Sequence, residues 1–424
     1  MTPEKSAAPA ARAARVTVVV LAAGLFGIWG LAQWLYNTQF QQFAAFFNFS
    51  QVQIAWTLSL FQIAYFVLAI PAALFHRQFG YKLGLLLSLS LFANGGFLLY
   101  LAVAQHGAAY FVCAVLIMGS GWAWLETCLN PLATEAGRPQ SAILRLNAIQ
   151  IFNGAGLLAA SFIAHNLAAS HLPAGQIVQS MAHPFIIIGL AWLLLAVVIE
   201  QLGFPASAKV RSNGASGIIQ ELRALARDKS VVLAAAALAA YCITLTVIWS
   251  AAYNYRIQEL GGRDFNLFGW VYFWFCAGRF ILVPLMRWID PVRLLQWCAC
   301  LSLAAVICAF AFGGMTGWVG ILAISCFMSI TFPTVFAATI TRHGTQSKLI
   351  SGLLVAGAGF GGAVGPLFVT PALQNWPIRE VLLLAIPFVA VIVVWTVSAN
   401  RDAHRSATLG ALGAAPKGPQ PAQI

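Results

Sequence analysis

Residues 109–133 read AYFVCAVLIMGSGWAWLETCLNPLA, an apolar run that contains a single acid, Glu126. A helix of about 20 apolar residues crosses a hydrocarbon core of about 30 Å. An acid deep inside such a helix costs about 2.5–3.5 kcal/mol on insertion, so its usual role is functional. The stretch therefore predicts a transmembrane helix that carries a protonatable group. The alternative is a structural acid that is hydrogen-bonded between helices.

Similar apolar runs recur along the whole chain, which is 61% hydrophobic and only 8% charged. The mean hydropathy of +0.84 lies far outside the range of soluble domains. Long continuous runs also exclude a transmembrane β-barrel, whose strands alternate in polarity. We therefore predict an all-α membrane protein with twelve spans, at residues 16–37, 53–75, 82–103, 109–133, 146–168, 184–204, 231–253, 265–288, 292–313, 318–340, 349–372 and 378–398.

The net charge of +12 follows the predicted topology. With the N-terminus inside, nineteen Lys and Arg residues fall on the inner side, whereas the outer loops hold only Arg256, Arg263 and Arg379. This is the positive-inside pattern, and it predicts that both termini are cytoplasmic in a bacterial inner membrane. The basic excess indicates contact with anionic lipid rather than nucleic acid.

A polar segment, residues 205–230, divides the twelve spans into six and six. A weak internal repeat supports this division, because Asn130-Pro131 matches Phe332-Pro333 at an offset of 202, and Arg145-Leu146 matches Lys348-Leu349 at an offset of 203. Two parallel repeats of six spans are therefore expected. The predicted domains are a cytoplasmic tail at 1–15, a six-helix bundle at 16–204, a cytoplasmic linker at 205–230, a second six-helix bundle at 231–398 and a cytoplasmic tail at 399–424. Both tails are rich in small and polar residues and are expected to be disordered.

Amides accompany Glu126 at membrane depth and share helix faces. Trp122, Glu126 and Asn130 are spaced i, i+4, i+8. Amides bind hydroxyl groups, and Trp and Tyr offer flat faces to a sugar ring. Taken singly, each amide could equally serve helix–helix adhesion. Taken together they predict a polar cavity, with substrate-binding candidates Trp29, Gln33, Asn37, Gln62, Asn130, Asn147, Gln150, Asn153, Trp249 and Tyr253. Arg279 in the eighth span is either a packing cation or a cavity cation.

Catalysis has little support in the sequence. The spans hold no nucleophile–base pair or metal-ligand set at depth, and the seven histidines lie largely in loops and at span ends. We expect no enzyme activity, no cofactor and no metal.

The fourth and fifth spans carry a more specific pattern: Leu125-Glu126-Thr127, Asn130-Pro131, Gly137, Arg145-Leu146-Asn147, Gln150, Phe152-Asn153 and Gly156. With these residues the chain resembles the major facilitator superfamily and, within it, the fucose–galactose–glucose proton symporter family. The resemblance implies two six-helix bundles that rock about a central sugar site. It also implies that Glu126 is the protonatable group and that Gln150 and Asn153 lie in the sugar cavity. Arg77, Gly80 and Lys82 resemble a degraded form of the superfamily's cytoplasmic loop motif, with His76 where an acid is usual.

One departure from that family concerns the first span, where the family has an acid and this chain has Asn37. An amide binds a hydroxyl but carries no proton. The expected function is uptake, with protons, of a monosaccharide of the fucose, glucose, galactose or N-acetylhexosamine class by alternating access. The alternatives are an uncoupled sugar facilitator and an exporter of another small polar or amphipathic solute. The expected partners are a small-molecule sugar, protons and membrane lipids, and we expect a monomer.

Overall fold

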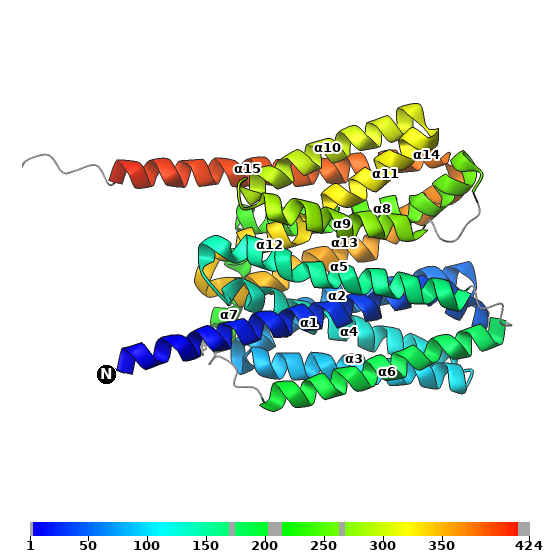
Figure 1. The fold of residues 1–424 in the computed structure, drawn as a ribbon, viewed down its shortest axis with the longest axis horizontal. Coiled ribbons are helices and arrows are strands. Elements are labelled where there is room, and N and C mark those ends of the chain that lie inside the picture. The colour runs from blue at the N-terminus through cyan, green and yellow to red at the C-terminus, as the bar shows by residue number, and fades with distance from the viewer. Residues whose placement is uncertain (1–2, 169–173, 202–213, 263–267, 414–424) are drawn as a thin grey trace, which may run out of the picture.

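The computed structural model describes residues 3–168, 174–201, 214–262 and 268–413, and every regular element in these ranges is a helix (Figure 1). The first group of long helices comprises α1 (Pro3–Phe46), α2 (Gln51–Phe79), α3 (Tyr81–Ala104), α4 (Ala108–Glu135), α5 (Ala142–Ala168) and α6 (Ala174–Gln201), with the short η1 (Pro139–Ser141) before α5. The second group comprises α8 (Lys229–Leu260), α9 (Phe268–Leu285), α10 (Pro291–Phe312), α11 (Gly314–Met328), α12 (Thr331–His343), η3 (Gly344–Gln346), α13 (Ser347–Asn375), α14 (Ile378–Leu383) and α15 (Ala385–Gly413).

Eleven segments of the described chain are long and apolar enough to cross a membrane. In this count α11 and α12 form one span, Gly314–His343, and α14 joins the first part of α15 in another, Ile378–Asp402. The shorter apolar stretch Gly269–Leu285, in α9, takes the remaining place among the twelve predicted spans. The predicted all-α membrane fold is confirmed.

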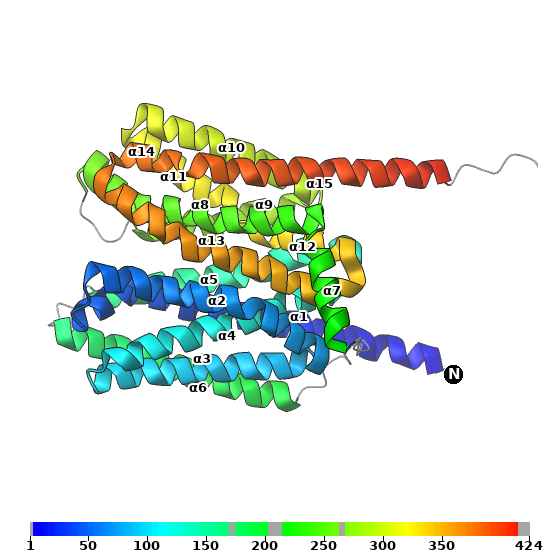
Figure 2. The same cartoon turned by 180° about the vertical axis from the view of Figure 1, so that it is seen from behind.

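The helices form two bundles that lie side by side (Figure 1). Within the first bundle α1 packs on α5 and α3 packs on α4, while within the second α8 packs on α13 and α10 packs on α11. The bundles meet where α2 contacts α13 and where α5 contacts α9. The start of α1 and the end of α15 lie at the same end of the molecule, which we call the terminal face (Figures 1 and 2).

The connection between the bundles contains α7 (Gly214–Leu225), which lies at the terminal face (Figure 2). Glu221 on α7 accepts a 2.6 Å hydrogen bond from Arg77 on α2 and a 3.4 Å bond from Gln346 in η3. A helix therefore links both bundles within the range expected to be the linker. Residues 205–213 of that range lie outside the described part of the chain.

The two tails differ from the expectation of disorder. α1 begins at Pro3 and α15 continues to Gly413, so helix covers most of the ranges 1–15 and 399–424. Both ranges are rich in Ala, a strong helix former. Extending an existing helix avoids the cost of a new nucleus, which explains why these segments continue the adjacent spans.

Small residues permit close helix packing in corresponding helix pairs of the two bundles. A Cβ at Gly156 on α5 would lie 2.1 Å from the Gly27 carbonyl oxygen on α1. A Cβ at Gly357 on α13 would lie 2.5 Å from the Ala235 carbonyl oxygen on α8. The contacts α1–α5 and α8–α13 thus follow the same pattern, as two parallel repeats require.

The repeated prolines each free a backbone carbonyl. Proline lacks an N–H, so the carbonyl four residues earlier loses its helical donor. In α4 this is the carbonyl of Thr127, which accepts a 3.0 Å bond from the Ser351 hydroxyl on α13. Before Pro333 it is the carbonyl of Ser329, at the break between α11 and α12, and it accepts a 3.0 Å bond from Arg279 Nε on α9. Side chains from other helices therefore satisfy both carbonyls, as the membrane interior demands.

Candidate functional site

A cavity of about 350 Å³ lies between the bundles. Its volume falls within the range of small-molecule sites, about 300–1,000 Å³. The wall consists of α1, α2, α4 and α5 from the first bundle and α8, α9, α12 and α13 from the second. Because both bundles form the wall, a rocking motion between them changes the shape and access of this cavity.

Glu126 lies in the wall on α4 and is 4% exposed. Its Oε2 accepts a hydrogen bond from the Tyr65 hydroxyl on α2. The ring of Trp122, one turn earlier on α4, lies 4.9 Å from the Tyr65 ring and 5.3 Å from the Trp29 ring on α1. The acid therefore sits beside a wall of aromatic rings and has one neutral hydroxyl partner.

An amide chain leads from the backbone of Glu126 toward the second bundle. Asn130 Nδ2 donates to the Glu126 carbonyl oxygen at 3.2 Å, and Gln150 Nε2 donates to Asn130 Oδ1 at 3.2 Å. Arg279 Nη2 then donates to Gln150 Oε1 at 3.2 Å, while Nη1 donates to the Gln150 carbonyl oxygen at 2.7 Å. Arg279 thus joins α9 to α5 and also lines the cavity, so it serves both as a packing cation and as a cavity cation.

Six of the ten predicted substrate-binding residues line the cavity: Trp29, Gln33, Gln62, Gln150, Asn153 and Trp249. Asn130 lies behind the wall and supports Gln150. Asn147 lies nearer the terminal face, where its Nδ2 donates to the Thr334 hydroxyl at 3.1 Å across the bundles. Tyr253 is 48% exposed and is not part of the described wall. The side chain of Asn37, on α1, lies outside the described part of the structure.

The sequence-based analysis missed several aromatic residues of the wall. Tyr36, Phe61, Tyr65 and Tyr272 all line the cavity. The spacing of Gln62 and Tyr65, i and i+3 on α2, places them on one helix face and is the signal that could have identified the hydroxyl partner of Glu126.

The loop motif residues lie at the terminal face. Arg77 pairs with Glu221 at 2.6 Å, and Lys82 Nζ donates to the Glu200 carbonyl oxygen at 2.7 Å. Gly80 has φ 87°, which allows the tight connection from α2 to α3. His76 is fully buried and lies 3.5 Å from the Thr127 hydroxyl. Arg77 thus ties α2 to the linker helix, and Lys82 ties the start of α3 to the end of α6.

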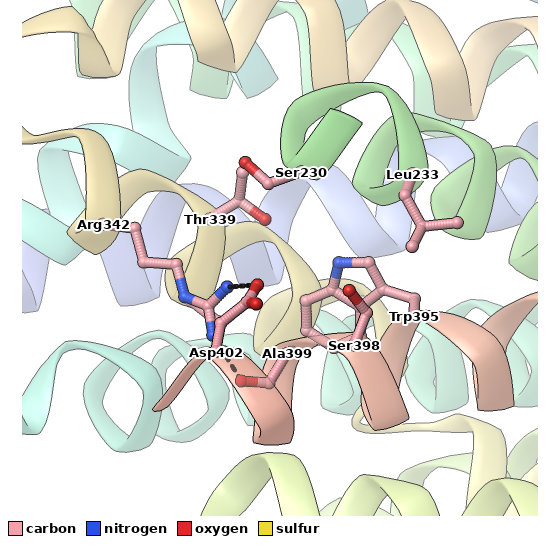
Figure 3. A pocket seen from close by; sticks show the side chains of 9 residues that line it. Ser230, Leu233, Thr339, Arg342, Trp395, Ser398, Ala399 and Asp402 are labelled. Atoms are coloured by element: carbon pink, nitrogen blue, oxygen red, sulfur yellow. Dashed lines mark hydrogen bonds and ion pairs between the residues drawn. The ribbon is translucent and has the colours of Figure 1, made fainter. Parts of the chain in front are cut away.

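A second, much smaller pocket lies between α8, α12 and α15 near the terminal face (Figure 3). Its volume of about 10 Å³ is roughly that needed for one water molecule. Arg342 spans it, pairing with Asp402 at 3.2 Å and donating to the Ala399 carbonyl oxygen at 2.6 Å (Figure 3). This pocket is too small for a sugar, so the central cavity is the candidate site.

A profile of the Major Facilitator Superfamily matches residues 16–348, more than half of the chain. The chain belongs to the major facilitator superfamily. It is 30% identical over 400 residues to an L-fucose-proton symporter of Escherichia coli K12, covering 88% of this chain and 91% of that protein. It is also 28% identical over 355 residues to a glucose/galactose transporter of Brucella abortus, covering 81% of this chain and 84% of the relative.

The fold is similar to a crystal structure of the superfamily transporter FucP in the outward conformation. The TM-score is 0.82 at 26% identity, over 91% of this chain and 99% of that one. Membership of this transporter superfamily agrees with the prediction of a carrier rather than an enzyme.

Proposed function

We propose that this protein is a secondary active transporter that moves a monosaccharide, or a close derivative, together with protons by alternating access. The observation that carries the proposal is a buried carboxyl, Glu126, in the wall of a cavity shared by both bundles. The sugar–proton symporter and the glucose/galactose transporter among the relatives support it.

In this proposal the proton is carried by Glu126. When ionised, the carboxylate accepts a hydrogen bond from the Tyr65 hydroxyl. When protonated, the carboxyl gains an O–H that can donate to a substrate oxygen. When Glu126 is protonated and neutral, the carrier can also change conformation without the cost of moving a buried charge. Substrate binding thus favours the protonated form, and this preference couples the two fluxes.

The terminal face is proposed to be cytoplasmic, because the inner-side excess of Lys and Arg falls on that face. In the terminal half, hydrogen bonds close the space between the bundles. Ser347 on α13 donates to Glu135 on α4 at 2.6 Å, and Asn147 donates to Thr334 at 3.1 Å. The arrangement is therefore interpreted as closed toward the cytoplasm, in line with its similarity to the outward conformation of FucP. The same proposal places the first bundle at 16–204, the linker at 205–230 and the second bundle at 231–398.

The substrate contacts are assigned to the amides and aromatic rings of the wall. Gln33, Gln62 and Asn153 can pair with hydroxyl groups, and Trp29 and Trp249 can cover the apolar face of a sugar ring. One proton that crosses about 100 mV supplies about 2.3 kcal/mol. This energy corresponds to roughly fifty-fold accumulation of a neutral sugar.

The test is Glu126→Gln in proteoliposomes with an imposed proton gradient. The amide mimics the protonated acid but cannot release a proton, so sugar exchange should continue while accumulation driven by the gradient is lost. Glu380→Gln is the matched control, because Glu380 is exposed on α14 and its side chain makes no hydrogen bond or ion pair among the described residues. It should accumulate sugar as the wild type does.

The outcome against the proposal is accumulation by Glu126→Gln at the wild-type level. Sugar flux in the wild type without any accompanying pH change would instead favour the uncoupled facilitator. Transport of no sugar by the wild type would remove the proposed substrate class altogether.

A further inference from the structure

Arg279 has more hydrogen-bonding capacity than its protein partners use. A guanidinium carries five N–H donors. Three hydrogen bonds of Arg279 are found in the described structure, to the carbonyl oxygens of Ser329 and Gln150 and to Gln150 Oε1. All three partners are neutral oxygens. The phenyl ring of Phe275 lies 4.7 Å from the guanidinium carbon and covers one face of it.

This cation is 2% exposed and faces the central cavity without a carboxylate partner among the described residues. Glu126 and Arg279 are the only charged residues in the described wall of the cavity. None of the five ion pairs found in the described ranges includes either of them. A buried cation without a counter-charge is costly, and pairing it with an anion recovers part of that cost.

The proton cycle makes the imbalance larger. When Glu126 is protonated, as the proposed function requires for substrate binding, Arg279 is the remaining charge in the described wall. The loaded cavity then carries a net charge of about +1 before any substrate enters. A neutral sugar leaves this charge in place, whereas an anionic sugar cancels it.

Other buried groups of the wall are also suited to an acceptor-rich ligand. Trp29 Nε1 and the Tyr36 hydroxyl are buried and have no hydrogen-bond partner in the described structure. Their side chains are 5% and 1% exposed. An indole N–H can only donate, and a carboxylate can only accept, with room for about four hydrogen bonds. The unpaired donors and the unbalanced cation therefore point to the same ligand chemistry.

We propose that the substrate is an acidic monosaccharide of the hexuronate class, whose carboxylate pairs with Arg279. This inference rests on the proposed sugar–proton symport and specifies its substrate. Three of the five N–H groups are engaged by the protein, so one N–H on Nη1 and one on Nη2 remain to donate charge-assisted hydrogen bonds to the carboxylate. The ring hydroxyls are then bound by Gln33, Gln62 and Asn153.

The charge balance of transport follows directly. A hexuronate carries one negative charge, and the proton on Glu126 carries one positive charge. Uptake of one hexuronate with one proton therefore moves no net charge, so the pH gradient drives it and the membrane potential does not. A neutral sugar taken up with one proton moves one positive charge and responds to the potential, by about 2.3 kcal/mol per 100 mV.

The first experiment measures binding to the purified wild-type protein in detergent at pH 6. The probes are D-galacturonate, D-galactose and methyl D-galacturonate, an ester that keeps the ring and removes the charge, together with D-glucuronate and D-glucose. In isothermal titration, at least one uronate should bind at least tenfold more tightly than its neutral sugar. If that uronate is galacturonate, it should also bind at least tenfold more tightly than its methyl ester. Arg279→Gln should reduce this preference to about one, and Arg279→Lys should keep part of it.

The second experiment records currents from proteoliposomes on a solid support. Addition of the preferred uronate should produce proton uptake without a transport current. Binding of a neutral sugar as tight as that of its uronate, or a current that accompanies uronate uptake, overturns the acidic-substrate inference and leaves sugar–proton symport intact. Failure of every sugar in the panel to bind also overturns the acidic-substrate inference, whereas sugar–proton symport is tested separately by the accumulation experiment with Glu126→Gln. A preference for the uronate that survives Arg279→Gln also overturns the assignment to Arg279.

Discussion

The hydrogen bond between Ser351 and Thr127 allows a direct test of how the bundles are held together in the terminal half. The Ser351 hydroxyl on α13 donates to the Thr127 carbonyl oxygen on α4 at 3.0 Å, and both residues are fully buried. Pro131 has no N–H to offer this carbonyl. Ser351→Ala therefore leaves a buried acceptor unpaired, at a cost of about 1–3 kcal/mol.

This cost falls mainly on the state in which the terminal half is closed, because the bond spans the two bundles. We expect the ratio of closed to open molecules to fall by about 5- to 150-fold. The ratio can be determined from distance distributions recorded by pulsed electron–electron double resonance, in a background without native cysteines. Spin labels at Arg138 and Arg287 suit this purpose, because both residues are exposed and they belong to different bundles, Arg138 between α4 and η1 and Arg287 between α9 and α10.

Two control variants make the reasoning refutable. Pro131→Ala restores an N–H for the Thr127 carbonyl, so Ser351→Ala should have a much smaller effect in that background. Ser302→Ala removes an equally buried hydroxyl, but Ser302 donates within α10 to the Cys298 carbonyl oxygen at 2.9 Å. It should leave the closed-to-open ratio unchanged. An equal effect of Ser351→Ala in the wild-type and Pro131→Ala backgrounds would refute the proposed role of the freed carbonyl.

Two further predictions concern stability. Gly156→Ala should prevent folding of the α1–α5 pair, because its Cβ would lie 2.1 Å from the Gly27 carbonyl oxygen. Gly24→Ala is the control, because a Cβ there meets nothing within 4 Å, and this variant should express normally. Size-exclusion chromatography after detergent extraction distinguishes the two variants. Asp228 caps α8. Partial burial raises the pKa of its carboxyl, but hydrogen bonds from Ser230 and His343 together lower this pKa by more, so that it lies below the ordinary value. A lowered folded-state pKa gives stability that is present above the unfolded value of about 3.9 and is lost as the pH falls through the folded value. Asp228→Asn should therefore flatten the dependence of the thermal midpoint on pH below about pH 4, and a slope unchanged from the wild type would contradict this assignment.

Composition and periodicity were sufficient to predict most of the fold. Each span requires a long apolar run, and such runs are visible in a single sequence. The break between α11 and α12 could not be predicted in the same way. Pro131 and Pro333 occupy matching positions of the repeat, but only Pro333 coincides with an interrupted helix. Which carbonyls find partners depends on neighbouring helices, and this tertiary information is absent from a hydropathy pattern.

The site was predicted in part, for a reason that lies in helix geometry. Asn147, Gln150 and Asn153 share one face of α5, but a helix rises about 1.5 Å per residue. Asn147 therefore lies about 9 Å closer to the terminal face than Asn153, at a depth where the bundles touch and the cavity has ended. Periodicity identifies the face of a helix, whereas the depth of a residue along that face is decided by where the partner bundle makes contact. Tyr65 was missed because tyrosine is common in membrane proteins, chiefly at their interfaces, and a single tyrosine is therefore a weak signal of function.

The repeated prolines connect the sequence repeat to the coupling between the bundles. Each proline frees the carbonyl four residues earlier, and in a membrane interior that carbonyl must find a donor. The carbonyl of Thr127 takes its donor from Ser351 in the opposite bundle, and the carbonyl of Ser329 takes its donor from Arg279, which also contacts Gln150 in the opposite bundle. Thr127 directly follows Glu126, so a change in the contact between the bundles at Ser351 acts on the backbone next to the proposed proton carrier. The proline of the first repeat thus places a bond between the bundles beside Glu126, and the proline of the second repeat frees a carbonyl that helps to hold Arg279, whose bonds to Gln150 join the bundles.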